Sequence, residues 1–236
     1  ILPNVLSTDV SPKMNKFGLF LIDDMIEFLG IELIPNEWPH LSEALLKFAT
    51  HKVSEVRQAA VYGIGVLAEK SRDSFKAISE YCVKALFESL AVKKAENESE
   101  KHYGYAKDNS VASLGKVIKS QAEFLPNLPE VVKVWLDNLP LKWDKKEARV
   151  QHELLVDIIL ASNASLVFGE KGENMQHVIQ IFAEIVNTKV STETIKNKII
   201  QVINLLVANQ ATAGLVKEAV GNLEVKYQNK LKEIMG

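Results

Sequence analysis

The sequence contains little cysteine, glycine, proline or net charge. Its single cysteine, Cys82, cannot form an internal disulfide or a thiolate-rich zinc site, which fits a reducing compartment. The 11 glycines and 7 prolines among 236 residues fall below average usage, and sheet-rich folds need many turns, so the composition favours helices. A formal charge of -2 provides no positive field to hold nucleic acid, so we expect no nucleic-acid partner.

Long apolar runs are absent as well. A membrane-spanning helix needs roughly 18 or more apolar residues, whereas the most apolar stretch, 17–29, is interrupted by Asp23, Asp24 and Glu27. We therefore expect a soluble protein with no membrane partner. The first residues lack the basic region and the cleavage site of a signal peptide, and we expect that the sequence begins inside a longer chain.

The residues that are present predict an all-α fold. Hydrophobic residues make up 47% of the chain and charged residues 25%, which is enough apolar surface for a core. Apolar residues recur at intervals of three and four, and alternation at period two is never sustained. The segment 93–102 is too charged for burial and predicts a long loop. Breaks between helices are predicted at 34–39, 51–54, 71–74, 124–129, 139–144, 162–165, 169–174 and 187–192.

The predicted helices come in pairs that repeat every 40 to 50 residues or so, the period of HEAT and armadillo units. The first helices of the pairs are predicted to begin near Asn36, Ser74, Pro126, Glu173 and Ala211. The second helices are predicted near Met14, Ser54, Tyr103, Asp144, Ser191 and Gly221. Such pairs bury their apolar faces only by stacking, so we expect one α-α superhelix, a HEAT solenoid of about five pairs, over the whole of 1–236. Its approximate units are 1–30 (partial), 36–70, 74–120, 126–162, 173–208 and 211–235.

A local motif in the predicted helix after Ser54 supports the HEAT assignment. The run Glu55-Val56-Arg57-Gln58-Ala59-Ala60 resembles a HEAT unit, in which the arginine reaches an acidic or backbone partner in the adjacent repeat. We therefore predict that Arg57 has an inter-repeat structural role. Gly63 and Gly65 follow, and because glycine costs about 1 kcal/mol inside a helix, they predict close packing of helices.

Two motifs are similar to ligand-binding motifs, but the residues around them argue against a binding site. The run 63–68 matches the GxGxxG/A pattern of dinucleotide sites, yet the residues before it have helical and not strand periodicity. The run 23–27 (DDMIE) is similar to the aspartate-rich motif with which all-α prenyl-chain enzymes hold magnesium, but no second facing motif exists. An all-α metal-dependent enzyme remains the alternative, and it requires magnesium near Asp23 and Asp24.

Other catalytic signals are missing. The five histidines form no HxxxH or HExxH pair, and the sequence has no Walker loop and no GxSxG elbow. Cys82 lies in an apolar helical segment, where burial makes a thiol inert. We therefore expect no enzymatic activity, no cofactor and no metal.

Polar residues along the second helices form a stripe in which acids outnumber bases. If these helices line a concave face, the stripe would attract basic peptide segments. The alternative is that these residues are only solvated helix faces. The candidate cargo contacts are Asp23, Asp24, Glu27, Glu55, Asp108, Asn109, Glu153 and Asp157.

Several segments together resemble the carboxy-terminal HEAT repeats of the importin beta superfamily, and most closely the importin-five subfamily, also called Ran-binding protein five. The segments are 17–30, 54–70, 108–120, 135–159 and 162–185, in the same order as in that family. The resemblance implies the carboxy-terminal part of a nuclear import receptor that shuttles between cytoplasm and nucleus. It implies three kinds of partner: cargo proteins with basic signals, phenylalanine-glycine nucleoporins, and the Ran GTPase, the last mainly through amino-terminal repeats.

The resemblance implies no catalytic residue. Grooves between adjacent first helices could accept phenylalanine-containing peptides, but no sequence feature identifies which groove. A HEAT-repeat scaffold of another multiprotein complex, with no role in transport, remains the alternative function.

Overall fold

The computed structural model describes residues 2–7, 9–30, 36, 38–161 and 163–235, and the regular elements in these ranges are all helices. The chain divides into two compact units, Ile1–Trp135 and Leu136–Gly236, which are considered one at a time. The predicted all-α fold of stacked helical pairs is confirmed. The continuity of the pairs in a single array over 1–236 stays a prediction.

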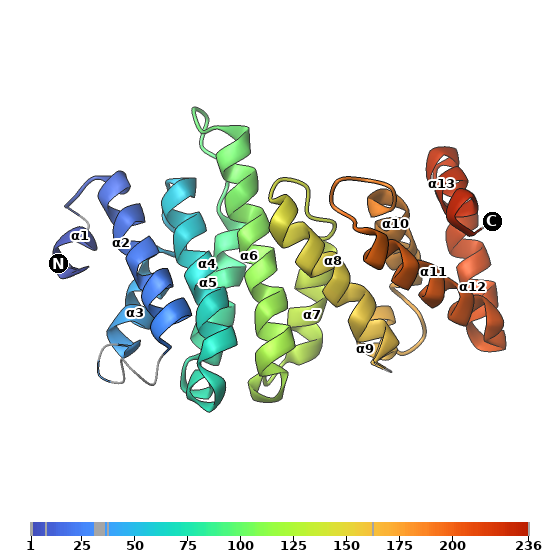
Figure 1. The fold of residues 1–236 in the computed structure, drawn as a ribbon, viewed down its shortest axis with the longest axis horizontal. Helices are drawn as coiled ribbons and strands as arrows, with labels where there is room; N and C mark the ends of the chain where they lie inside the picture. Colours follow the sequence, from blue (N-terminus) through green and yellow to red (C-terminus); the bar gives the residue numbers. More distant parts are fainter. Residues whose placement is uncertain (1, 8, 31–35, 37, 162, 236) are drawn as a thin grey trace. The chain divides into compact units, whose positions relative to one another are not determined.

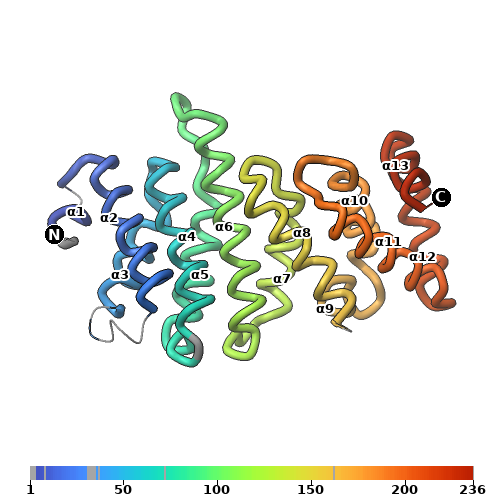
Figure 2. The backbone as a smooth tube through the Cα atoms, in the orientation of Figure 1, coloured from blue at the N-terminus to red at the C-terminus, as the bar shows by residue number. Residues whose placement is uncertain are grey.

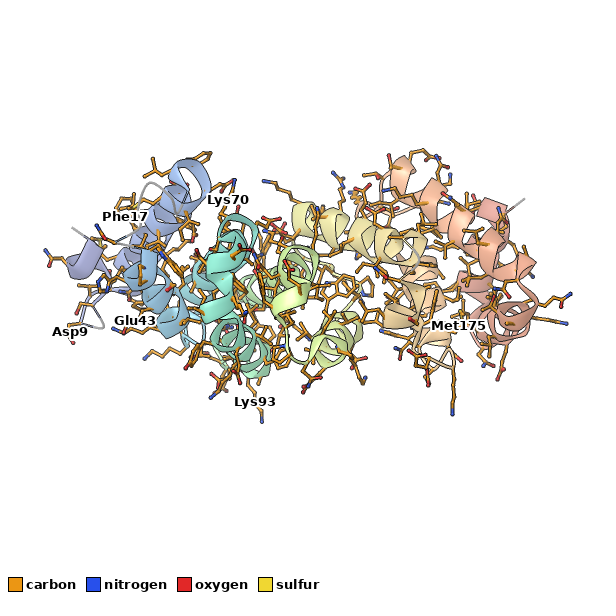
Figure 3. The ribbon with its side chains drawn as sticks, turned by 90° about the horizontal axis from the view of Figure 1, so that it is seen from below. Asp9, Phe17, Glu43, Lys70, Lys93 and Met175 are labelled. Carbon is orange, nitrogen blue, oxygen red and sulfur yellow. The ribbon has the colours of Figure 1, made fainter. Side chains whose placement is uncertain are left out.

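In the first unit, α2, α4 and α6 lie side by side, and α3 and α5 pack behind them (Figure 1). The labelled side chains mark the two layers: Phe17 of α2 and Lys70 of α4 lie on one side, and Glu43 of α3 and Lys93 lie on the other (Figure 3). The elements are α1 (Leu2–Val5), α2 (Pro12–Asp24), the π-helix η1 (Met25–Leu29), α3 (Trp38–Phe48), α4 (Ser54–Lys70), the 3₁₀ helix η3 (Arg72–Ala77), α5 (Ser79–Ala91), α6 (Glu100–Gln121), η4 (Ala122–Phe124) and α7 (Leu128–Asp137), which ends just past the boundary between the units.

In the second unit, α8 packs on α11, and α10 packs on α12 and α13; Figure 2 traces their path. His152 ties two loops of this unit together: its Nδ1 lies 2.9 Å from the carbonyl of Val190, and the Leu141 amide donates to its Nε2 at 3.2 Å. Burial lowers the pKa of His152 to about 4, so the imidazole is neutral. The helices are α8 (Lys145–Leu160), α9 (Ala164–Phe168), α10 (Met175–Ile185), α11 (Glu193–Ala208), α12 (Gln210–Gly221) and α13 (Val225–Met235).

The predicted helix starts lie close to the observed ones. The largest difference is at α5, which begins at Ser79 because the 3₁₀ helix Arg72–Ala77 occupies the predicted start. α6 begins at Glu100, inside the charged segment predicted as loop, since a helix end in water tolerates charged residues. The short helix α9 was not expected, and it begins at Ala164, inside the predicted break 162–165.

Within the described residues, no single helix is long and apolar enough to cross a membrane. The pair α11 and α12 passes that test only when the two helices are joined across a bend of 119°.

The centre of the first unit is α4, which is buried over most of its length. Its two inner glycines permit close approach to both neighbours. A Cβ on Gly63 would lie 2.2 Å from Oδ1 of Asp23, and a Cβ on Gly65 would lie 2.6 Å from Oγ of Ser113. The glycines of the GxGxxG pattern are therefore packing residues inside a helix, as their helical context predicts.

We predict that Gly63→Ala destabilises the first unit by about 1 to 3 kcal/mol, because the added methyl collides with Asp23 and Leu45. Gly214→Ala in α12 is the matched control, since its Cβ would meet nothing within 4 Å and alanine favours a helix. Chemical unfolding of both variants measures the difference, and equal stability of the two would contradict this account of the packing.

Candidate functional site

The structure separates the eight predicted cargo contacts by their exposure. Asp24 and Asp157 are exposed, and Glu27, Glu55 and Glu153 are half-buried. Asp23, Asp108 and Asn109 are instead buried, because the close packing of α2, α4 and α6 covers this part of the stripe. The expectation that all eight face solvent is therefore corrected for these three.

Asp23 is enclosed where α2 meets α4. Only 3% of the residue is exposed, its Oδ1 faces Gly63, and neither carboxylate oxygen has a hydrogen-bond partner in the described part of the chain. Burial, with added repulsion from Asp24 and Glu27, raises the pKa of Asp23 to about 8, although Lys116 of α6 acts in the opposite direction. Asp23 is therefore mostly uncharged at neutral pH and adds little to a negative surface.

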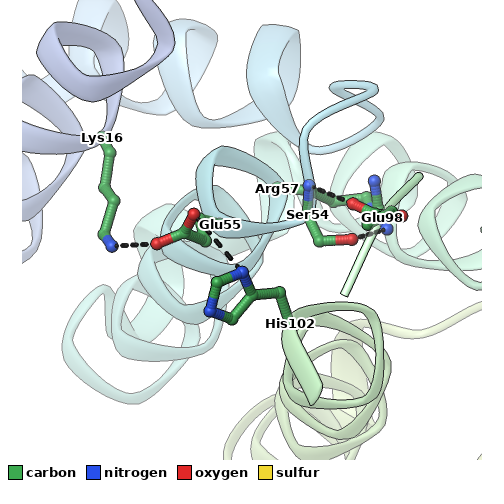
Figure 4. Close-up of polar contacts among 6 residues, drawn as sticks. All are labelled: Lys16, Ser54, Glu55, Arg57, Glu98 and His102. Carbon is green, nitrogen blue, oxygen red and sulfur yellow. Dashed lines mark hydrogen bonds and ion pairs between the residues drawn. The ribbon is translucent and has the colours of Figure 1, made fainter. Parts of the chain in front are cut away.

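Glu55 lies at the start of α4, between α2 and α6 (Figure 4). Its Oε1 accepts a hydrogen bond from Lys16 Nζ at 2.8 Å, and its Oε2 lies 3.5 Å from Nδ1 of His102. The bond from Lys16 lowers the pKa of Glu55, so this carboxylate stays charged but is partly neutralised by its partner. It links three second helices and offers a weaker field to a ligand than an unpaired acid would.

Arg57 is almost fully buried, and its hydrogen bonds stay within its own helical pair. It donates to the carbonyl of His51 at 2.6 Å and to Oγ of Ser54 at 2.7 Å. Its guanidinium lies 6.0 Å from the ring centre of Tyr103 in the next pair. The expected acceptor in the adjacent repeat is instead used by Ser54, whose amide donates to Glu98 at 2.9 Å (Figure 4). The inter-repeat structural role of Arg57 stays a prediction: its hydrogen bonds hold the start of α4, where Ser54 makes the inter-pair bond, and only its contact with Tyr103 reaches the next pair.

In the second unit, Glu153 and Asp157 of α8 share one partner. Lys198 of α11 donates to both carboxylates at 2.7 Å. The bond to Asp157, and then that to Glu153, raises the pKa of Lys198. Both acids therefore serve the packing of α8 on α11, and only their outer oxygen atoms remain open to a ligand. No sequence pattern indicated this lysine, because it lies about forty residues away along the chain.

An apolar groove lies on the other layer of the first unit, between α5 and the start of α7. Its volume is about 370 Å³, and five of its ten lining residues are apolar. The other lining residues are polar or charged: Glu80, Lys84, Glu88, Asn127 and Glu130. The sequence offered a weak signal for it, the apolar i, i+4 pair Val83 and Phe87 on α5. The apolar lining consists of Val83, Phe87, Leu125, Pro126 and Val131.

The described residues contain no group of three histidine, cysteine, aspartate or glutamate side chains placed to hold a metal ion. The alternative that requires magnesium at Asp23 and Asp24 therefore gains no support. Cys82 is buried, and burial raises the pKa of its thiol to about 12.

No family model matches the sequence. The chain is 21% identical over 228 residues to a probable importin-5 homolog of Dictyostelium discoideum, across 95% of this chain. It is also 23% identical over 193 residues to importin subunit beta-3 of Saccharomyces cerevisiae, across 80% of this chain. The chain is similar in sequence to importins. The resemblance to the importin beta superfamily is thereby confirmed, whereas the importin-five subfamily is supported more weakly.

The importin-related chain spans 20% and 17% of the lengths of these two relatives, so it corresponds to about a fifth of either protein.

We predict that Arg57→Ala destabilises the importin-related chain by about 1.5 to 3 kcal/mol, because it removes the charged donor to the part-buried carbonyl of His51 and to the buried hydroxyl of Ser54. Arg149→Ala is the control: Arg149 also donates to a loop carbonyl, that of Lys189, but is exposed. Thermal unfolding distinguishes them. If Arg57→Ala and Arg149→Ala have equal melting temperatures, the buried hydrogen bonds of Arg57 do not stabilise the chain.

We predict that Asp23→Asn raises stability at pH 8. The pKa of Asp23 is about 8 when folded and near 3.8 when unfolded, so the folded state holds a proton that the unfolded state releases. Stability therefore falls as pH rises from about 4 to 8, by at most about 1.4 kcal/mol per pH unit from this group. Urea unfolding at several pH values tests this: the variant should have a flatter profile, and an unchanged slope would contradict it.

Proposed function

We propose that this chain supplies protein-binding surfaces to a nuclear transport receptor that shuttles between cytoplasm and nucleus. Its relationship to two importins over most of its length supports the proposal, as does its fold of stacked helical pairs. In this proposal the chain acts by binding and not by catalysis. Affinity comes from apolar contacts and charge on a stack of helices.

The groove between α5 and α7 is the observation that carries the proposal. A phenylalanine side chain needs an apolar recess of modest size, and a cavity of about 370 Å³ lined by Val83, Phe87 and Val131 accommodates one. The glycine that follows each phenylalanine in nucleoporin repeats lets the peptide backbone pass the charged lining residues without a steric clash. The groove thus matches phenylalanine-glycine nucleoporins in both size and chemistry.

The second-helix layer is the proposed surface for basic cargo segments. Asp24 and Asp157 are exposed, and the partly open Glu27, Glu55 and Glu153 add to the negative potential of their own units. Because Lys16 and Lys198 already neutralise part of this charge, we propose weak, salt-sensitive cargo contacts. Release of cargo by Ran belongs to the same proposal at the level of the whole receptor.

The second candidate function, a scaffold in another multiprotein complex, also uses stacked helical pairs. A scaffold function does not require an apolar groove of the size of a single phenylalanine side chain. Binding of phenylalanine-glycine peptides therefore separates the two functions.

We predict that a peptide with several phenylalanine-glycine repeats binds the chain and shifts NMR signals of α5 and α7, whereas a serine-glycine peptide of equal length does not. Val83→Glu should weaken binding about tenfold or more, because it introduces a charge into the apolar recess. Tyr81→Glu is the matched control, since Tyr81 lies on the same helix, is 65% exposed and does not line the groove.

Absence of peptide binding to the unmodified chain would remove the transport proposal and leave the scaffold. Equal loss of binding in Val83→Glu and Tyr81→Glu would place the peptide outside this groove.

A further inference from the structure

The second-helix layer of the first unit exposes an apolar face along α2. The exposed fractions are 43% for Met14, 53% for Phe17 and 46% for Phe20. Phe17 projects from this side of the unit (Figure 3). The opposite side of α2, with Leu19 and Ile22, is fully buried against the rest of the unit. Apolar patches of this kind usually mark an interaction surface.

Two exposed charges frame this face. Lys13 precedes Phe17 by four residues, and Asp24 follows Phe20 by four. The spacing of four, three and four places these residues on one stripe of the helix, in the order Lys, Phe, Phe, Asp. We call this stripe, formed by Lys13, Phe17, Phe20 and Asp24, the α2 stripe.

The α2 stripe is complementary to itself when reversed. It is symmetric about the point midway between Gly18 and Leu19, so an antiparallel second copy would place Lys13 opposite Asp24 and Phe17 opposite Phe20. The two charges are about 16 Å apart along the helix at 1.5 Å per residue. Two helices that cross at about 20° stay close over that length, so both ion pairs and the central phenylalanine contacts form together.

We propose that two copies of this chain associate through antiparallel pairing of their α2 stripes, around a two-fold axis. The same surface on both copies makes the contact, as an isologous interface requires. A single pair of helices buries less surface than a stable dimer needs, so the association is weak and depends on concentration.

Charge complementarity selects a second copy over other partners. A purely basic helix would meet repulsion from Lys13, and a purely acidic helix would meet repulsion from Asp24. A partner must carry both signs at the reversed spacing with aromatic residues between them. This chain has that arrangement. Lys16 adds little free charge beside the stripe, because its ammonium is held by Glu55 at 2.8 Å, and it lies 5.7 Å from the centre of the Phe20 ring.

Sedimentation velocity or light scattering over a range of concentrations tests the proposal on the 236-residue chain. The two-fold axis creates two Lys13–Asp24 pairs in the dimer. Each of the single variants, Lys13→Glu and Asp24→Lys, therefore places like charges opposite one another in both pairs. Each should therefore weaken self-association about tenfold at low salt. The double variant Lys13→Glu/Asp24→Lys reverses both charges together and should restore it.

Phe17→Ser should also weaken self-association. Val225→Ser is the matched control, because Val225 is 70% exposed but lies on α13 in the other unit. Circular dichroism confirms that each variant is folded. A chain that stays monomeric at all concentrations would overturn the proposal, and so would a double variant that associates no better than the single variants.

Discussion

The close approach of α4 to α2 and α6 is the constraint on which the first unit depends. It is possible only because Gly63 and Gly65 have no side chains, so Asp23 and Ser113 can lie against the helix backbone. Polar side chains then fix the register of the two helices: Ser113 donates to the carbonyl of Val61, and Gln121 to that of Ala68, both at 2.6 Å. These buried hydrogen bonds prevent α6 from sliding along α4, because any shift would leave a buried polar group without a hydrogen-bond partner.

This packing decides which acids remain available for binding. Asp23 is buried and mostly uncharged, Asp108 is buried, and Glu55 joins α4 to α2 through Lys16, so the second-helix layer of the first unit leaves little of its negative charge free and uses part of it to join its own helices. In the second unit Glu153 and Asp157 do the same through Lys198. A stripe of acids on successive helices thus has a structural function before it has a binding function. The field left for a cargo protein is weaker than the sequence suggests.

The sequence predicted the fold well because the evidence is local. The period of the apolar residues identifies helices, short breaks identify their ends, and the repeat length identifies the pairs. Burial could not be predicted in the same way. Asp23 and Asp24 are adjacent and chemically equal, yet one is buried and the other exposed, and only the position of α4 determines which. The partnership of Lys198 with Asp157, and the groove between α5 and α7, likewise depend on residues far apart in the chain.

The two layers of the first unit therefore have different properties for binding. In the second-helix layer, small residues let the backbones approach, and that layer is closed by packing. In the first-helix layer, larger side chains such as Phe87 of α5 and Val131 of α7 line an apolar groove. A solenoid that is tight on one side and open on the other offers pockets for single side chains on its open side. On its tight side it offers only the outward faces of its helices, so a partner there must match a helix stripe such as that of α2.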